Sequence, residues 1–258
     1  LGQGAQLHAD QDLTGSAGRD LRLEALAGGY AMATQGSARG IDGQPSHVIE
    51  GAVTHQAGQV TAGGNITLAA QGEALLRGVD LAAGKRDQGM DQAQSASQGQ
   101  GEGTGNIHVQ GRDVTIATAT DSAWYDRRMT GKHHVIRHTG QDEALAGGTL
   151  AAAGNITVLA TGTPAADPPS AADAPPKPAA QGGAITVTGS HLAAQAGSVT
   201  LVANERITVQ AATTRHAEGS AYAHRGGTLL RRESQAQSRQ ADATVAHPST
   251  LSAHDVLL

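Results

Sequence analysis

Apolar and polar residues alternate in short runs along most of this chain. In "ITL" at 66–68 and "ITV" at 156–158, for example, two apolar side chains flank one Thr. A period of two, rich in β-branched residues, is typical of short strands with one buried face, and Thr suits the half-exposed position between them. The alternation therefore predicts an all-β protein whose short strands bury every second side chain.

These strands belong to a repeat. Six patches share the alternation, most of them after a turn of small residues; they are "GRDLRLEA" (18–25), "GGNITLAA" (63–70), "TGNIHVQGRDVTIATA" (104–119), "AGNITVLA" (153–160), "GGAITVTGSHLAAQAGSVTLVANERITVQAA" (182–212) and "AHDVLL" (253–258). Ile185, Val199 and Ile207 are spaced by 14 and then 8 residues, about one circuit of a three-sided coil. A coil cannot bury its apolar face until the next coil lies on it. The repeat therefore predicts a right-handed parallel β-helix, or solenoid.

Asn and Asp mark the expected turns. The four Asn residues each stand one to three positions before a strand, where Asn tolerates left-handed and Asx-turn conformations; they are Asn65, Asn106, Asn155 and Asn204. Four Asp residues are also expected in turns, three of them directly before or near a strand; they are Asp20, Asp80, Asp113 and Asp255. Stacked coils are expected to place such turns above one another.

Five segments break the repeat and are expected to form excursions outside the β-helix wall; they are 28–58, 85–103, 121–147, 163–181 and 215–248. All aromatic residues and all Met residues lie in these segments. The 121–147 and 215–248 segments each combine an aromatic residue, a basic cluster and a central Gly, which favours a two-stranded hairpin that folds over at the Gly. The final patch restarts the pattern, so we treat 1–258 as a single β-helical segment of a larger protein.

Composition limits which residue types can form the core and which classes of partner the chain can bind. The chain has 35 Gly, no Phe and only one Trp and three Tyr, so the core is expected to consist of Val, Ile, Leu and Ala. A net charge of −5 argues against a nucleic-acid partner. The absence of Cys excludes disulfides, thiolate zinc sites and cysteine nucleophiles. No apolar run approaches the ~20 residues that span a bilayer.

Two sets of residues are candidates for metal binding or catalysis. His133, His134 and His138 lie within six residues, as metal ligands can, but a solvated hairpin face is the expected role, with no metal and no cofactor. Some β-helices are polysaccharide lyases and hydrolases, whose sites need converging carboxylates. The outward strand positions here are mainly Thr, so we expect no enzyme; Asp113 is the acid whose substitution would test the alternative.

Partner-binding candidates come from the two richest excursions. The residues combine aromatic rings with positive or titratable groups; they are Trp124, Tyr125, Arg127, Arg128, His133, His134, Tyr222, Arg231 and Arg232. One interpretation is a specific glycan or receptor site around Trp124 and Tyr222. Another is a polyanion site, for a sulfated glycan or lipopolysaccharide, on the basic residues of the last excursion, with surface solvation as the simpler explanation.

The phrases "GGNITLAA" (63–70) and "GGTLAAAGNITV" (147–158), together with the basic, Gly-centred excursion "RHAEGSAYAHRGGTLLRRESQAQ" (215–237), resemble the hemagglutinin repeats of filamentous hemagglutinin and the stalks of contact-dependent growth inhibition proteins of Gram-negative bacteria. The resemblance covers nearly the whole chain. It implies a very long exoprotein that a two-partner secretion system exports through an outer-membrane transporter and that folds outside the cell.

The resemblance implies a non-enzymatic stalk or adhesion segment, secreted or held at the bacterial surface, that presents loops to a receptor or glycan on a host or neighbouring cell, or that carries a C-terminal toxin. Two alternatives stay open: a specific glycan- or receptor-binding module that uses the excursions, and a polysaccharide-active β-helix enzyme. Open strand edges at the end coils also leave room for end-to-end or edge-to-edge self-association.

Overall fold

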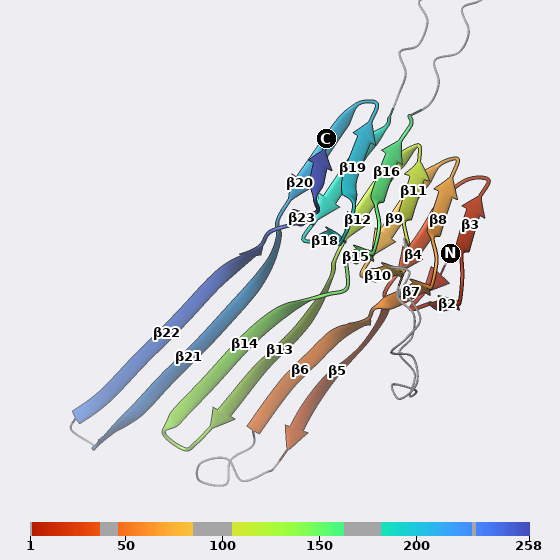
Figure 1. Ribbon diagram of the computed structural model, residues 1–258. Helices are drawn as coiled ribbons and strands as arrows, with labels where there is room; N and C mark the ends of the chain where they lie inside the picture. The colour runs from red at the N-terminus through yellow and green to blue at the C-terminus, as the bar shows by residue number, and fades with distance from the viewer. Residues whose placement is uncertain (1, 37–45, 85–104, 163–181, 229–230) are drawn as a thin grey trace, which may run out of the picture.

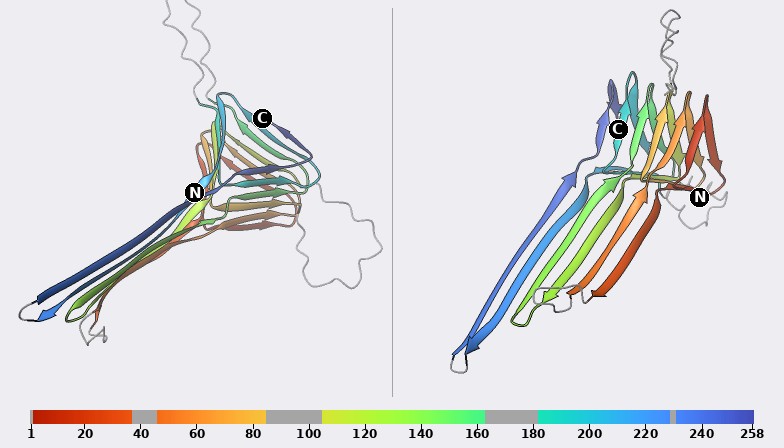
Figure 2. Two further views of the ribbon diagram at one scale, coloured as in Figure 1. Left: turned by 90° about the vertical axis from the view of Figure 1, so that its left-hand side faces the viewer. Right: turned by 90° about the horizontal axis from the view of Figure 1, so that it is seen from below.

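The computed structural model describes residues 2–36, 46–84, 105–162, 182–228 and 231–258. All the helices and strands assigned in these residues are β-strands; there is no helix among them. Three six-stranded parallel sheets form a three-sided rod (Figure 1). A fourth six-stranded sheet is antiparallel and extends away from the rod as a blade, called here the wing (Figure 2). The expected parallel β-helix with hairpins outside its wall is therefore confirmed.

The rod sheets are named A, B and C in the order in which the chain visits them. Sheet A contains β1 (Gly2–Gln3), β4 (Leu21–Glu24), β9 (Glu73–Arg77), β12 (Asp113–Ala117), β17 (Ala184–Thr188) and β20 (Arg206–Gln210). Sheet B contains β2 (Gln6–Ala9), β7 (Gly58–Ala62), β10 (Val79–Ala83), β15 (Thr149–Ala152), β18 (His191–Ala194) and β23 (Thr250–Ser252). Sheet C contains β3 (Leu13–Ala17), β8 (Ile66–Ala70), β11 (Ile107–Gly111), β16 (Ile156–Ala160), β19 (Ser198–Ala203) and β24 (Asp255–Leu257).

One strand from each sheet makes one coil, so the described strands make six coils. Ile185 pairs in parallel with Ile207, 22 residues later, which gives the length of a coil without insertions. This agrees with the circuit expected from the spacing of Ile185, Val199 and Ile207. Along the chain, Val199 comes between these two residues, on strand β19 of sheet C.

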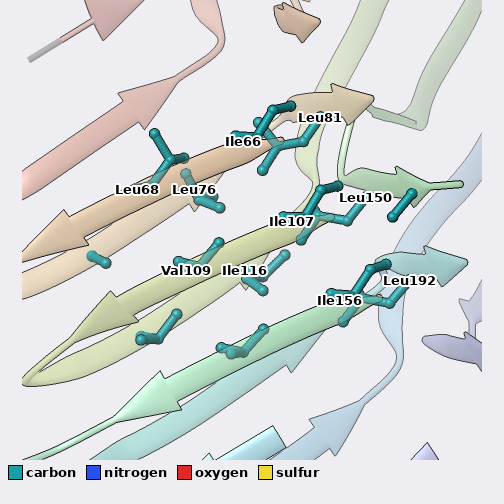
Figure 3. Packing of buried hydrophobic residues seen from close by; sticks show 14 of the residues in the cluster. Ile66, Leu68, Leu76, Leu81, Ile107, Val109, Ile116, Leu150, Ile156 and Leu192 are labelled. Carbon is teal, nitrogen blue, oxygen red and sulfur yellow. The ribbon is translucent and has the colours of Figure 1, made fainter. Parts of the chain in front are cut away.

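The core consists of columns of aliphatic side chains that run along the rod (Figure 3). In sheet C, Ile66, Ile107, Ile156 and Val199 lie one above another in register, and each is at most 1% exposed. Leu81, Leu150 and Leu192 form a similar column in sheet B. Each such side chain contributes roughly 1.5–3 kcal/mol by leaving water. The core residues are all Val, Ile, Leu or Ala, as composition led us to expect.

Stacked Asn side chains hold the corner between sheets B and C. Asn65 Oδ1 accepts hydrogen bonds from the backbone N and side-chain Nδ2 of Asn106, both at 2.9 Å. Asn106 Oδ1 accepts from Asn155 N at 2.7 Å, and Asn155 Oδ1 from Ser198 N at 2.8 Å. The expected stacking of turns is therefore present for three Asn residues. Asn204 differs, because it lies after β19 at the corner between sheets C and A.

The wing consists of three hairpins. They are β5 (Leu26–Gly36) with β6 (Ser46–Gln56), β13 (Ala119–Thr130) with β14 (His134–Ala146), and β21 (Ala212–Thr228) with β22 (Arg231–His247). The excursions expected at 28–58, 121–147 and 215–248 fall on these hairpins; those expected at 85–103 and 163–181 lie outside the described residues. Each hairpin leaves the rod between sheets A and B, in the second, fourth and sixth coils.

The hairpins lie on every second coil, and this spacing matches the width of a hairpin. Neighbouring strands lie about 4.8 Å apart, so a hairpin occupies about 9.6 Å along the rod, which is the rise of two coils. Successive hairpins therefore meet edge to edge: β6 pairs with β13, and β14 with β21. The result is one continuous sheet in the order β22-β21-β14-β13-β6-β5.

In the coils that carry no hairpin, a glycine forms the corner between sheets A and B. Gly78 joins β9 to β10 with a φ of +61°. A methyl group on Gly78 would lie 2.8 Å from the Cβ atoms of both Ala25 and Ala119, which stand where the hairpins of the neighbouring coils begin. Only glycine combines this left-handed backbone with so close an approach.

Candidate binding surface on the wing

Successive residues of a strand point to opposite faces of a sheet, so the wing has two faces with different side chains. Trp124 pairs with Gln141, and its neighbour Tyr125 pairs with Gly140. The two rings therefore lie on opposite faces. We call the face with Trp124 the tryptophan face and the face with Tyr125 the tyrosine face.

All three tyrosines share the tyrosine face. Tyr30 is aligned through Ala52 with Ala123, two residues from Tyr125. Tyr222 pairs with Ile136, which pairs with Met129, four residues from Tyr125. Each hairpin thus contributes one tyrosine from its first strand, and Tyr30 and Tyr222 are 60% and 37% exposed.

Tyr125 lies at the centre of the tyrosine face. Its ring covers Gly140 on the neighbouring strand, where a side chain would collide with it. The Arg127 guanidinium lies 5.0 Å from the ring centroid, within the range of a cation–π contact, and its Nη2 is 3.5 Å from Glu50 Oε2. Hollows of 360 and 350 Å³ lie beside the ring, and His138 lines both of them. The face combines an aromatic ring, positive charge and concave space.

The tryptophan face carries a wider groove. Trp124 packs over Gly51: a methyl group there would lie 2.7 Å from its Cζ2. Further out, a groove of 610 Å³ is lined by basic and small side chains, among them His47, Arg128, Arg137, Ala221, Ala223 and Ala236. Arg128 pairs across the sheet with both His47 and Arg137.

Of the three paired residues His47, Arg128 and Arg137, Arg137 has its charge neutralised by Asp126. Its Nε and Nη2 donate to the two carboxylate oxygens of Asp126 at 2.9 and 2.7 Å, and these bonds lower the pKa of Asp126. Arg128 makes no ion pair within the described part of the chain. The free positive charge of this groove therefore belongs to Arg128.

The other predicted partner-binding residues lie toward the hairpin tips. His133 is in the turn of the second hairpin, and His134 pairs with His224 of the third. The Nε2 atom of His134 is buried and has no hydrogen-bond partner. Arg231 and Arg232 begin β22 at the tip of the third hairpin, and both are exposed.

The structure divides the predicted site. A single site around Trp124 and Tyr222 is wrong, because the two rings are on opposite faces of the sheet. Arg127 and Arg128 are separated in the same way. Sequence reasoning also missed Tyr30 as a member of the tyrosine face; its position on the first strand of a hairpin, as for the other tyrosines, was the available signal.

Geometry bears on the metal hypothesis as well. His134 and His138 point to the same face of β14 but lie four residues apart, about 13 Å along a strand. Among the described residues, no group of three or more His, Asp or Glu side chains is arranged to hold a metal.

Asp113 has a structural role at the corner between sheets C and A. Its Oδ1 accepts hydrogen bonds from Gly183 N at 2.8 Å and Ala184 N at 3.1 Å, and Arg112 Nε donates to Oδ2 at 2.9 Å. Burial works to raise the pKa of Asp113, but these hydrogen bonds outweigh it and the pKa is lowered. The acid singled out for an enzyme thus ties one coil to the next.

Comparison with known proteins identifies one family. Residues 129–247 match the family model described as hemagglutinin repeat, which covers the end of β13 through the end of β22. No curated protein and no solved structure matches the chain. The described residues contain no helix that could cross a membrane. The match supports a hemagglutinin-repeat segment of the filamentous hemagglutinin kind over residues 129–247, carried on a parallel β-helix.

Proposed function

We propose that this chain is a non-enzymatic stalk and adhesion segment in which the rod extends and the wing makes contact with a target surface. One observation carries the proposal: the aromatic side chains of the described residues are all on the wing, with Trp124, Tyr222 and Tyr30 exposed by 37% or more. An exposed set of large rings on a soluble surface is typical of a recognition site.

The rod supplies reach and stiffness. Each coil adds about 4.8 Å of length, and its strands pair with the coils on both sides along three sheets. Its outer wall is built largely from small polar side chains, such as Thr67, Thr157 and Thr200 in sheet C. Side chains of this size offer a partner little contact area, so we assign recognition to the wing.

The family suggests the setting. We place the parent protein outside a Gram-negative cell or on its surface, exported by an outer-membrane two-partner secretion transporter. There it would adhere to a host or neighbouring cell, as a virulence factor or as a carrier of a C-terminal toxin in contact-dependent inhibition. The absence of Cys agrees with export through an oxidising compartment.

A glycan- or receptor-binding module on the tyrosine face is the second candidate. The two hollows beside Tyr125 and the guanidinium of Arg127 favour it, because sugar rings stack on aromatic faces and Arg binds acidic substituents. In this case the wing itself is specific and does more than increase contact area.

Binding assays with face-specific variants test both candidates. The chain, the variant Tyr125→Ser with Tyr222→Ser, and the matched variant Trp124→Ser are applied to host cells, bacterial cells and a glycan panel, with circular dichroism to confirm folding. Loss of binding with the tyrosine variant alone supports a site on the tyrosine face. Loss with the Trp124 variant alone assigns adhesion to the other face.

Absence of binding by the unaltered chain to every surface would overturn adhesion by this segment. The chain would then be a spacer within its parent.

A further inference from the structure

The 610 Å³ groove of the tryptophan face crosses most of the wing. Its lining residues come from five of the six strands, from His47 on β6 to Ser238 on β22. Four strand spacings of about 4.8 Å separate these two strands, so the groove is about 19 Å long. It opens on a face of the sheet, so strands that pair with β5 or β22 would leave it open.

The charged residues of the groove stand in its middle. Asp126 and Arg128 are on β13, and Arg137 is on β14. With His47 neutral, two arginines and one aspartate give this stretch a net charge of +1. Because Arg137 donates to both carboxylate oxygens of Asp126, Arg128 is the group left to bind an anion.

Toward β22 the floor of the groove is small and uncharged. Val135 of β14 pairs with Ala223 of β21, which pairs with Ala236 of β22. One level nearer the rod, Ala221 pairs with Arg137 and continues its row. Residues that pair across a sheet point to the same face. An apolar strip made of Ala221, Ala223 and Ala236, called here the alanine strip, therefore runs from the charged middle to β22.

We propose that this groove binds a long-chain carboxylate, with its carboxylate on Arg128 and its acyl chain across the alanine strip toward β22. Three strand spacings, about 14 Å, separate β13 from β22 and accommodate an extended chain. A guanidinium binds a carboxylate through two parallel hydrogen bonds, and burial of methylene groups against the strip stabilises the bound chain. The inference goes beyond the proposed adhesion and does not depend on it.

Other ligand classes match the groove less well. A polyanion needs several unpaired cations, and Arg128 is the one arginine of the groove without an ion pair in the described residues. A sugar ring stacks on an aromatic face, but Trp124 does not line the groove and the Tyr222 side chain points to the opposite face. One negative charge and one long apolar part fit the charge and the floor of this groove.

Trp124 supplies the readout, because it is the only Trp of the chain and points to the same face. It lies two residues, about 7 Å, from Asp126 along β13. Dodecanoate that carries bromine on its chain should therefore quench Trp124 fluorescence when it binds in the groove. Dodecanol with the same label keeps the chain and lacks the charge, so it should bind about tenfold more weakly or worse.

Two arginines of the tryptophan face test the role of charge. Arg128→Gln should weaken dodecanoate binding by about tenfold or more and leave dodecanol binding unchanged. Arg225→Gln removes the same charge nearer the hairpin tip, outside the groove, and should change neither. Equal dodecanoate affinities of the two variants, or equal affinities of the unaltered chain for dodecanoate and dodecanol, would overturn the role of Arg128.

Chain length and floor substitutions test the alanine strip. Each CH₂ group buried on the strip should strengthen binding by up to about fourfold, so octanoate should bind more weakly than dodecanoate. Ala223→Gln should weaken the binding of dodecanoate and dodecanol alike, whereas Ala243→Gln, on the opposite face, should not. Octanoate that binds as tightly as dodecanoate would overturn the path of the acyl chain. Circular dichroism confirms that each variant is folded.

Vesicles of anionic phospholipid with brominated chains separate a bound molecule from a membrane surface. Quenching by dodecanoate below the concentration at which it forms micelles is the expected result. Quenching by the vesicles alone would mean that this face lies against a membrane, and would reject the groove as a site for a single carboxylate.

Discussion

Asp121 joins the first hairpin of the wing to the second by binding His55 twice. Its Oδ1 accepts a hydrogen bond from the His55 backbone N at 2.7 Å and lies 3.0 Å from the ring Nδ1. The next junction has a similar pair: His216 Nδ1 lies 3.0 Å from Asp142 Oδ1. Each junction between hairpins therefore carries one His–Asp contact.

Replacing Asp121 with Ala should loosen the first junction. A hydrogen bond to a charged group contributes about 1.5–3 kcal/mol, so the His55 amide should exchange its hydrogen at least about tenfold faster. Hydrogen exchange measured residue by residue checks this. Asp142→Ala is the matched control, and should leave His55 protected; equal exchange at His55 in both variants would contradict a local contact.

A charge in the column of sheet C should unfold the rod. Ile156 is 0% exposed between Ile107 and Val199, so Ile156→Asp buries a carboxylate without a partner and should cost more than about 4 kcal/mol. The neighbouring Thr157→Asp points outward and should cost less than about 1 kcal/mol. Denaturant unfolding of both variants measures the difference, and similar midpoints would refute the assignment of faces.

Gly78→Ala should destabilise the corner between sheets A and B. Its φ of +61° and the two Cβ atoms at 2.8 Å leave no strain-free place for a methyl group, and the expected cost is about 2 kcal/mol or more. Gly28→Ala, on the wing, is the control, because nothing lies within 4 Å of its added methyl. Thermal unfolding should separate the two; a neutral Gly78 variant would argue against this turn.

Acid should weaken the coil contact made by Asp113. The pKa of this carboxyl is below its ordinary value near 3.8, so it stabilises the fold above that value, and the contribution is lost as the pH falls through the lowered pKa. The free energy of unfolding, measured between pH 5 and pH 2, should therefore fall less steeply for Asp113→Asn than for the unaltered chain. Superimposable pH profiles would remove Asp113 from the acid response.

Much of the rod followed from local patterns. The alternation around Ile66 and Ile156 predicted strands and their buried face, and the spacing from Ile185 to Ile207 predicted the length of a coil. These features depend on the β period and on turn preferences, which act over a few residues. The ends of the hairpins were also within reach, because the alternation stops where the chain leaves the rod.

The candidate site was harder to predict from the sequence than the rod. Trp124 and Tyr222 look alike in sequence, since each stands near a basic cluster in an excursion, yet they lie on opposite faces of the wing. Their faces depend on the register between β13, β14 and β21, and a shift of one residue would exchange them. Asn204 shows the same limit, because the pattern before a strand does not say which of the three corners it occupies.

The sequence by itself determined an all-β chain of stacked aliphatic coils, interrupted by hairpins that hold every aromatic ring outside the core. Only the tertiary structure decided that the hairpins join into one sheet, which tyrosines share a face, and that Asp113 and Asp121 act as links between coils and hairpins. The reason is physical: strand formation is set by neighbours in the chain, whereas pairing between strands far apart in sequence is set by the rise of the rod, which brings each hairpin level with the next.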